Sequence, residues 1–372
     1  MKDTIAALIT NTINQLIKEE KLPSALNYNI NIDATKDKKH GDFASNISLI
    51  LAKQAGMPPR QLAELIVNSV SASQDNNIEK LEIAGPGFIN FFVNSASNYV
   101  ILDQVFSQGD AFGRCDIGNG KKYQVEFVSA NPTGPLHVGH GRGAAYGASV
   151  ADLLEAAGFE GSREYYVNDA GRQMNILAAS VWLRYLESYH SELVFPVNGY
   201  KGDYVHTIAA ELKKQHGDAL LHSIEAVTEG LPKDENEGGD KERYIDAIIE
   251  RAKQLLGEKY TLVFDEGLNA IVDDIREDLG EFGVHYQEWF SEASLADSID
   301  AALKKLEDNG HIHEQDGAQW FRSTTFGDNN DRVVNRDNGQ TTYFTSDMAY
   351  HLNMSETGFD HVINLWDADH HA

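Results

Sequence analysis

Cysteine, basic residues and long apolar runs are scarce in this sequence. Its 372 residues contain one cysteine, Cys115, which excludes a disulfide framework and a cysteine-based zinc cluster and fits a reducing compartment. The start of the chain has no basic segment followed by an apolar run. No stretch approaches the ~18 consecutive apolar residues that a membrane-spanning helix needs. We therefore expect a cytoplasmic protein with no membrane contact.

The shortage of basic residues bears on the partners of the protein. Lys and Arg total 31 against 57 Asp and Glu, a net charge of −26, which taken alone argues against RNA binding. Salt screens charges beyond about 10 Å, however, so a local basic cluster such as Lys36, Lys38 and Lys39 can still contact phosphates. An acidic protein also suits a small cationic substrate.

The chain is long enough for two or three domains, since 42% of its residues are hydrophobic. Residues 1–110 predict an α+β domain, because helical spacings of apolar residues are mixed there with strand patterns and Pro/Gly turns. The elements expected in it are helices over 5–17, 47–51, 62–70 and 95–107, a strand over 28–32, and a hairpin that turns at 85–87.

Residues 111–372 predict a different architecture, an α/β fold with a parallel nucleotide-binding (Rossmann-like) sheet. Strand patterns at 123–127 and 164–167 alternate with helix patterns at 138–157 and 174–185. This alternation is typical of parallel sheets with crossover helices.

Strand patterns are absent from about residue 190 to 270, which we interpret as a helical insertion. The charged run 233–243 within it is best explained as a solvated loop. A helix is expected over 268–282, and the apolar run 362–366 predicts a buried strand. No closing helix follows that run, so we expect the sheet to be incomplete.

The residues after the first strand of the second domain combine prolines, a glycine and two histidines. Pro132 and Pro135 stiffen the connection, Gly134 lets a ligand approach the backbone, and His137 and His140 stand three apart at the next helix start. Backbone N–H groups and the helix dipole favour anions there, and two imidazoles suit a phosphate under attack. A purely structural role for both histidines is the alternative, and their pairing favours the phosphate site.

Glycines recur every four residues in the same helix, at Gly139, Gly143 and Gly147. Each glycine weakens a helix by roughly 1 kcal/mol and therefore needs a steric reason. We interpret the series as a helix thinned for close packing against the sheet.

Two other enzyme classes are open on the residues alone. A nicotinamide-dependent oxidoreductase is suggested by Gly139-His-Gly-Arg-Gly-Ala144, which matches the pattern G-x-G-x-x-A, although residues 131–135 already make the strand-to-helix turn. A metal-dependent phosphoesterase is the main alternative, since clustered His and Asp suit Mn²⁺ or Zn²⁺. Its ligands would be His137, His140, Asp369, His370 and His371.

The segment Ser129-Ala-Asn-Pro-Thr-Gly-Pro-Leu-His-Val-Gly-His-Gly-Arg142 resembles the "HIGH" signature of class I aminoacyl-tRNA synthetases in its arginine-specific form. The likeness covers nearly the whole chain, and further blocks follow in the family's order. They lie at 41–46, 85–90, 166–173, 282–286, 291–292, 326–328, 343–347 and 367–371. A non-catalytic, tRNA-binding relative is a further alternative, but the retained histidines and acids speak against it.

The resemblance implies a ligase that joins L-arginine to tRNA-Arg through an arginyl-adenylate formed from ATP with Mg²⁺. The ATP-binding residues that it implies are Asn131, Pro132, Thr133, Gly134, Pro135, Leu136, His137, Val138, Gly139 and His140, of which His137 and His140 are catalytic. The arginine-binding residues that it implies are Glu126, Asn131, Glu292, Tyr343, Asp347 and His370. Phe88 and Asn90 are the implied tRNA contacts, and the family often has glutamine at the position of His370.

The family also has a lysine-rich "KMSK" loop and a C-terminal helical anticodon-binding domain. Neither is present in these 372 residues. We therefore expect the chain to contain the N-terminal domain and part of the catalytic domain, to be inactive by itself, and to be a monomer.

Overall fold

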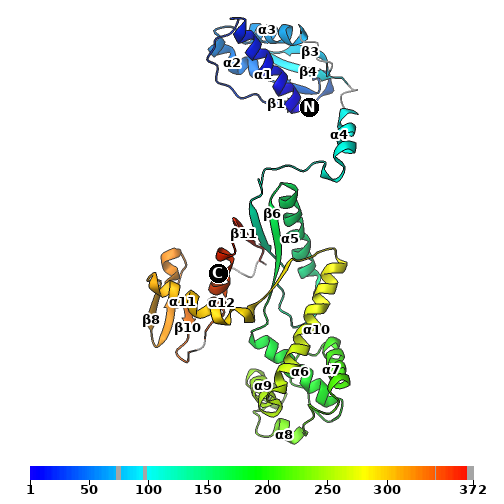
Figure 1. Cartoon of the computed structure of the whole chain (residues 1–372), viewed down its shortest axis with the longest axis vertical. Helices are drawn as coiled ribbons and strands as arrows, with labels where there is room; N and C mark the ends of the chain where they lie inside the picture. Colours follow the sequence, from blue (N-terminus) through cyan, green and yellow to red (C-terminus); the bar gives the residue numbers. More distant parts are fainter. Residues whose placement is uncertain (73–76, 95–98, 340, 367–372) are drawn as a thin grey trace. The chain divides into compact units, whose positions relative to one another are not determined.

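A computed structural model describes residues 1–72, 77–94, 99–339 and 341–366. The chain divides into two compact units, Met1–Gly113 and Arg114–Ala372, whose elements are labelled in Figure 1. The boundary that we expected after residue 110 lies close to this division. No helix in the described ranges has the length and apolar content that crossing a bilayer requires.

The first unit is built on a four-stranded antiparallel sheet with the order β1-β2-β4-β3. Its core consists of apolar side chains from α1, α2, α3 and β4, among them the fully buried Ile5, Ile9, Leu51 and Phe91. The elements are α1 (Lys2–Lys18), β1 (Ile32–Ala34), η1 (Lys38–His40), β2 (Phe43–Ser45), α2 (Ile47–Ala55), α3 (Pro59–Ala72), β3 (Ile78–Ala84), β4 (Phe88–Val93), α4 (Val100–Gln108) and η3 (Gly109–Ala111).

The strand expected over 28–32 is wrong in its position, because β1 begins only at Ile32. Tyr28 and Ile30 pack against the core of this unit from an irregular segment. Contact with a core on one side produces the same alternation as a strand, without the hydrogen-bonded neighbour that makes one. The helices at α1, α2 and α3 and the β3–β4 hairpin are confirmed.

The second unit is built on a four-stranded parallel sheet with the order β11-β5-β6-β7, which confirms the expected parallel α/β fold. The central strand β5 (Lys122–Glu126) is buried from Tyr123 onward, since parallel strands are covered on both faces. Around it lie α5 (Val138–Ala156), β6 (Glu160–Val167), β7 (Glu288–Ser291) and β11 (His361–Asn364).

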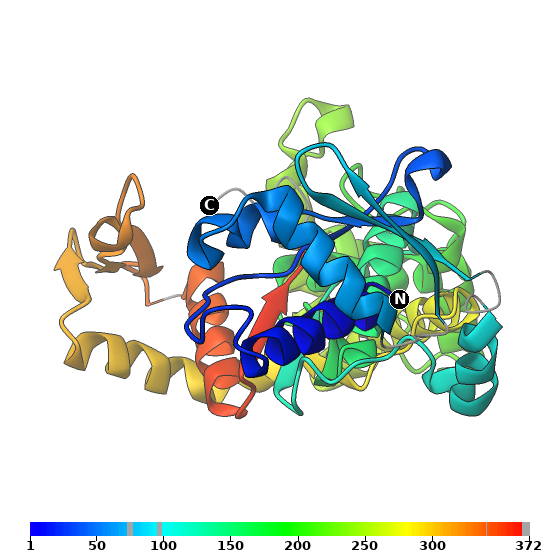
Figure 2. The ribbon, with the colours of Figure 1, turned by 90° about the horizontal axis from the view of Figure 1, so that it is seen from above.

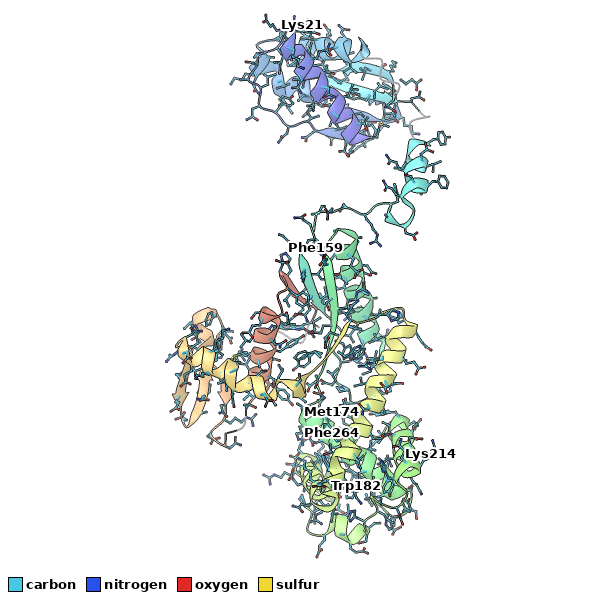
Figure 3. The ribbon with its side chains drawn as sticks, in the orientation of Figure 1. Lys21, Phe159, Met174, Trp182, Lys214 and Phe264 are labelled. Carbon is cyan, nitrogen blue, oxygen red and sulfur yellow. The ribbon has the colours of Figure 1, made fainter. Side chains whose placement is uncertain are left out.

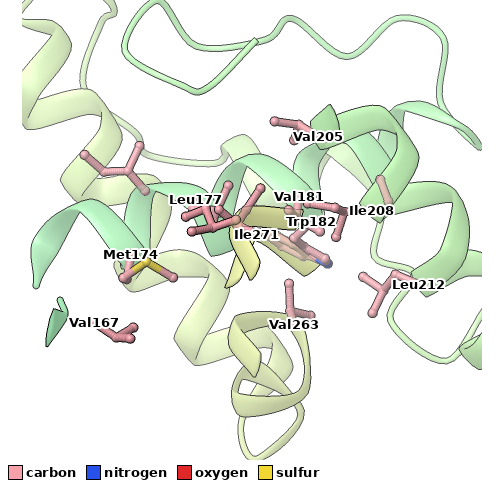
Figure 4. Packing of buried hydrophobic residues seen from close by; sticks show 14 of the residues in the cluster. Val167, Met174, Leu177, Val181, Trp182, Val205, Ile208, Leu212, Val263 and Ile271 are labelled. Carbon is pink, nitrogen blue, oxygen red and sulfur yellow. The ribbon is translucent and has the colours of Figure 1, made fainter. Parts of the chain in front are cut away.

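A group of helices joins β6 to β7 and contains the insertion expected at 190–270. Trp182 on α6, labelled in Figure 3, is fully buried and packs in one cluster with Val181, Ile208, Leu212 and Val263 (Figure 4). The group therefore begins earlier and ends later than we expected, because α6 and α10 belong to its core. Its members are α6 (Arg172–Glu187), α7 (Asp203–His216), α8 (Ile224–Thr228), η4 (Glu235–Glu237), α9 (Lys241–Leu256) and α10 (Lys259–Glu281).

After β7 the chain forms a small antiparallel sheet with the order β10-β9-β8 (orange in Figures 1 and 2) before it returns to the parallel sheet. The buried strand expected over 362–366 is wrong in burial, because β11 lies at the end of the parallel order and Val362 is 40% and Trp366 58% exposed. The elements of this part are η5 (Glu292–Leu295), α11 (Ala296–Asp308), β8 (Ile312–Gln315), β9 (Ala318–Phe321), η6 (Ser323–Phe326), β10 (Arg332–Asn335) and α12 (Tyr343–Glu356).

Candidate active site

The second unit contains a cavity of about 1210 Å³ at the C-terminal ends of the parallel strands β5 and β6. This is the usual ligand position in an open α/β sheet. Its walls come from β5, α5, α11, α12, Phe321 of the small sheet and the residues after β11. Of the expected ATP- and arginine-binding residues, those that line it are Glu126, Asn131, Gly139, His140, Tyr343 and Asp347.

The backbone is strained where β5 enters the cavity. Val128 and Ser129 have φ angles of 68° and 42°, a left-handed conformation that side chains with a Cβ rarely adopt. The reversal brings the Ser129 hydroxyl back to donate to Glu126 Oε1 at 2.5 Å, and the same hydroxyl accepts from the Tyr166 N–H at 3.1 Å. Glu126, only 5% exposed, is thereby held at the base of the cavity.

His137 and His140 cap the start of α5 for each other. The His137 Nδ1 accepts from the N–H groups of Gly139 at 3.1 Å and His140 at 3.4 Å, and the His140 Nδ1 accepts from the His137 N–H at 3.3 Å. The rings stack with centroids 3.6 Å apart. A neutral imidazole that accepts at Nδ1 carries its proton on Nε2, so each ring has an Nε2–H donor beyond the helix start.

The structural and ligand roles of His137 can be separated by substitution. His137→Ala should lower the free energy of unfolding of the second unit by about 1 kcal/mol, because it removes a helix cap. His137→Asn should retain most of that stability, because asparagine caps helices well. Urea denaturation followed by tryptophan fluorescence measures this, since all four tryptophans lie in the second unit. Equal losses in the two variants would show that ring stacking, and not capping, holds the helix start.

The glycine series of α5 has more than one role, which corrects our interpretation of a helix thinned throughout for packing. A Cβ at Gly147 would meet the Phe127 ring at 2.2 Å, so close packing applies there. A Cβ at Gly143 would meet no described residue within 4 Å, and Gly143 lines the cavity. A Cβ at Gly139 would meet the His137 ring at 2.9 Å, so Gly139 leaves room for the capping imidazole.

One face of α12 reaches into the cavity. Tyr343 and Asp347, four residues apart near the start of the helix, line it from exposed positions, and the buried Tyr350 follows on the same face. The Tyr350 hydroxyl donates to Oε1 of Glu164, a buried carboxylate beside Glu126 on the neighbouring strand. Burial raises the pKa of Glu164, the Tyr350 hydrogen bond lowers it, and the charge of Glu126 raises it.

Glu164→Gln tests this buried charge. A carboxyl whose pKa is raised by folding contributes stability below its unfolded pKa, and loses that contribution as the pH rises through the folded value. The variant, whose amide oxygen can still accept from Tyr350, should therefore melt at a higher temperature than the wild type at neutral pH. The difference should shrink as the pH falls towards the ordinary value of 4.5. Thermal melts across this range check it, and a difference independent of pH would contradict it.

Glu292 begins η5, directly after β7. It is 7% exposed, and its Oε2 is a buried atom without a hydrogen-bond partner among the residues that the structure describes. Burial raises the pKa of Glu292, a hydrogen bond from Ser346 lowers it, and the charges of Asp347 and Asp169 raise it. An unpaired buried carboxylate oxygen is costly unless a ligand supplies a donor, and the charge of Asp347 nearby favours a cationic one.

The remaining expected site residues lie outside the cavity lining. His137, Pro132, Thr133, Gly134, Pro135, Leu136 and Val138 form the strand-to-helix connection and helix start, where the Tyr204 hydroxyl donates to the Thr133 carbonyl at 2.7 Å. Phe88 and Asn90 belong to β4 of the first unit, where Phe88 is 39% exposed and Asn90 only 4%. His370, with Asp369 and His371, lies outside the described residues.

Three of the five ligands of the phosphoesterase alternative, Asp369, His370 and His371, lie outside the described residues. Within the described residues there is no group of three or more His, Cys, Asp or Glu side chains that could hold a metal ion. His137 and His140 use their Nδ1 atoms to cap α5.

The sequence assigned no role in the site to several of its residues, although Tyr166 and Gln173 lie in the block at 166–173 that resembles the family. Gln173 accepts from Asn131 Nδ2 at 3.0 Å and so sets the direction of that amide. Tyr350 and Glu164 form the buried pair described above, and Tyr166 lines the cavity beside them. The helical spacing of Tyr343, Asp347 and Tyr350 could have indicated a common face. No sequence signal links Glu164 to Tyr350, because tertiary packing alone brings them together.

Two known domain families match this chain. One, described as the arginyl tRNA synthetase N terminal domain, matches residues 3–93. The other, described as the catalytic domain of tRNA synthetases class I (R), matches residues 102–372 and so most of the chain. The chain belongs to the class I (R) tRNA synthetase family. The resemblance seen in the sequence is thereby confirmed for both parts of the chain.

Individual members of the family agree with this assignment. The arginine–tRNA ligase of Thioalkalivibrio sulfidiphilus is 57% identical over 375 residues, and that of Acinetobacter baylyi is 50% identical over 385 residues. Each alignment covers 100% of this chain and 64% of the relative, so the chain spans 64% of the length of these relatives.

Solved structures resemble the chain as well. A Campylobacter jejuni protein described as an arginyl tRNA synthetase matches 75% of this chain and 55% of its own, with a TM-score of 0.63 and 29% identity. The arginyl-tRNA synthetase of Thermus thermophilus covers 95% of this chain and 53% of its own, with a TM-score of 0.51 and 21% identity, and supports the fold alone.

Proposed function

We propose that the cavity of the second unit binds L-arginine and ATP and forms arginyl-adenylate, from which arginine passes to tRNA-Arg. The observation that carries the proposal is the set of carboxylates at the cavity. Glu126 and Asp347 line it, and the buried Glu292 near Asp347 has an oxygen without a hydrogen-bond partner in the described part of the chain. Arginine, with an ammonium at one end and a guanidinium at the other, matches acceptors separated in this way.

The ammonium end of arginine is assigned to the end of β5. Glu126 is held there by the Ser129 hydroxyl, and Asn131, oriented by Gln173, would contact the carboxylate end. The guanidinium is assigned to Asp347, Glu292 and Tyr343, and His370 belongs to the same proposed pocket. A planar cation with five N–H donors needs several acceptors to discriminate against a neutral analogue.

The reaction places few chemical demands on the protein itself. The arginine carboxylate attacks the α-phosphorus of ATP, the bond from that phosphorus to the pyrophosphate oxygen breaks, and a ribose hydroxyl of the tRNA later displaces AMP. Positioning and stabilisation of charge carry such a displacement. The Nε2–H groups of His137 and His140 would donate to phosphate oxygens, and Gly143, which lines the cavity, leaves space along α5 for the nucleotide. Mg²⁺ would enter with the phosphates of ATP.

The first unit is proposed to contact tRNA. The matched family of residues 3–93 is named for arginyl tRNA synthetases, Phe88 is exposed enough for a base to stack on it, and Lys36, Lys38 and Lys39 form an exposed basic cluster. Asn90 is buried, so a contact through its side chain would require β4 to open. We further propose that the protein acts as a cytoplasmic monomer.

Ligand binding by this chain tests the proposal. Equilibrium dialysis with labelled arginine should show binding that lysine displaces weakly and citrulline, the neutral ureido analogue, displaces least. Any ATP–pyrophosphate exchange should depend on arginine, and tRNA-Arg should be tested for its ability to increase it. Equal displacement by citrulline and by arginine would overturn the arginine assignment. Stoichiometric bound metal together with hydrolysis of a phosphate ester would favour the phosphoesterase instead.

A further inference from the structure

The turn that presents Glu292 is held from a different strand. β6 and β7 end side by side, with Val167 opposite Ser291. Two residues beyond Val167, the carboxylate of Asp169 crosses to the β7 turn, where Oδ2 accepts from the Ser291 hydroxyl at 2.5 Å and Oδ1 accepts from the Ala293 N–H at 2.7 Å. One carboxylate therefore forms hydrogen bonds with the residues on both sides of Glu292.

Asp169 is itself buried and has no ion-pair partner among the described residues of the chain. Burying a charge without a paired cation is unfavourable, and the charge of Asp169 also raises the pKa of the neighbouring Glu292 carboxyl. Charge alone therefore does not explain an acid at this position. The two short hydrogen bonds of Asp169 explain it better. A carboxylate that accepts from both a hydroxyl and a backbone N–H of one turn holds the residue before Glu292 and the residue after it in place.

We infer that Asp169 is a positioning residue that sets the direction of the Glu292 carboxylate for the guanidinium of the substrate. The inference rests on the proposed function, since it deepens the assignment of Glu292. Asp169 itself would not touch the guanidinium. Its effect passes through Ser291 and Ala293, so it should act on discrimination between arginine and citrulline and leave ATP binding unchanged.

Three variants of the whole chain distinguish three effects of Asp169: its hydrogen bonds to the turn, its charge, and its contribution to the stability of the fold. Asp169→Ala removes both hydrogen bonds to the turn. Asp169→Asn removes the charge but keeps one acceptor and one donor, which can still engage the Ala293 N–H and the Ser291 hydroxyl. Asp234→Ala is the matched control, because Asp234 is equally buried and its carboxylate accepts from the N–H groups of Val197 at 2.8 Å and Glu235 at 2.7 Å, in the helical group.

Dissociation constants for arginine, citrulline and ATP should be measured by equilibrium dialysis for all three variants and the wild type. Asp169→Ala should weaken arginine binding by about 10-fold or more and reduce its preference over citrulline, because a misdirected acceptor loses a charge-assisted hydrogen bond. Asp169→Asn should stay within about 3-fold of the wild type, which is below 1 kcal/mol. Asp234→Ala should change neither ligand preference nor ATP affinity.

Each outcome decides between the inference and its alternatives. Unchanged arginine binding by folded Asp169→Ala would overturn it, and so would an equal loss in Asp169→Asn, which would show that charge matters and position does not. If Asp169→Ala does not fold, Ser291→Ala, which removes one of the two hydrogen bonds, should still lower the preference for arginine over citrulline. A wild-type chain that binds citrulline as well as arginine would instead refute the proposed function, and the inference with it.

Discussion

Glu292→Gln should weaken the binding of arginine by about 10- to 100-fold, because a hydrogen bond to a charged group contributes about 1.5–3 kcal/mol. The glutamine side chain has nearly the same volume but presents an amide, whose N–H₂ would oppose the donors of a guanidinium. Citrulline, which has no positive charge, should bind almost equally well to both proteins. Equilibrium dialysis with the two ligands gives the preference directly.

Glu292→Gln should be more stable than the wild type, although it binds arginine more weakly. Burial raises the pKa of Glu292, so the ionised carboxylate lowers the stability of the folded chain at neutral pH. Removing its charge should raise the melting temperature while binding falls. Glu288→Gln is the matched control for binding, because Glu288 is an exposed residue at the start of the same strand β7 and its substitution should leave the affinity for arginine unchanged. A variant that binds arginine normally would exclude Glu292 from the guanidinium pocket.

Gly147→Ala should destabilise the second unit, and Gly143→Ala, one helical turn earlier in α5, should stabilise it by up to about 1 kcal/mol. Both substitutions replace glycine by a better helix former. Only at Gly147 does the added Cβ fall on a buried ring, at 2.2 Å from two carbons of Phe127. The difference between the two variants therefore isolates the cost of overpacking, about 1–3 kcal/mol.

Urea denaturation followed by tryptophan fluorescence measures this difference in the unit that contains all four tryptophans. The two variants make the same Gly→Ala change in the same helix and are followed by the same tryptophan fluorescence, so each serves as the control of the other. Gly143→Ala should also weaken ATP binding if the nucleotide lies along this part of the cavity. Equal stability of the two variants would mean that α5 can move away from Phe127.

Local features of the chain were predicted well where the signal itself is local. The helix expected over 138–157 is α5, which ends at Ala156 before Gly158, a glycine with φ of 85°. Its start at His137 follows from side chains that cap neighbouring N–H groups, an interaction within four residues. The rings of His137 and His140 lie together at the helix start, as their spacing of three residues predicts.

Predictions of strand pairing and burial were less successful, because both depend on which other elements pack against a segment. Alternation at Tyr28 and Ile30 indicated a strand, but these residues pack on a core without a strand partner. The apolar run at 362–366 indicated burial, but an end strand of a sheet leaves Val362 exposed. Neighbouring strands and helices decide such cases, and they come from distant parts of the sequence.

The sequence alone determined the parallel α/β class, the turn and helix that follow β5, and the family to which the chain belongs, because each depends on short-range patterns. The tertiary structure alone decided that Glu126 and Asp347 line one cavity with Glu292 close to Asp347, that Glu292 Oε2 has no hydrogen-bond partner among the described residues, and that Asp169 binds the turn that contains Glu292. These contacts join strand ends and a helix far apart in the chain, and only the folding of the sheet brings them together.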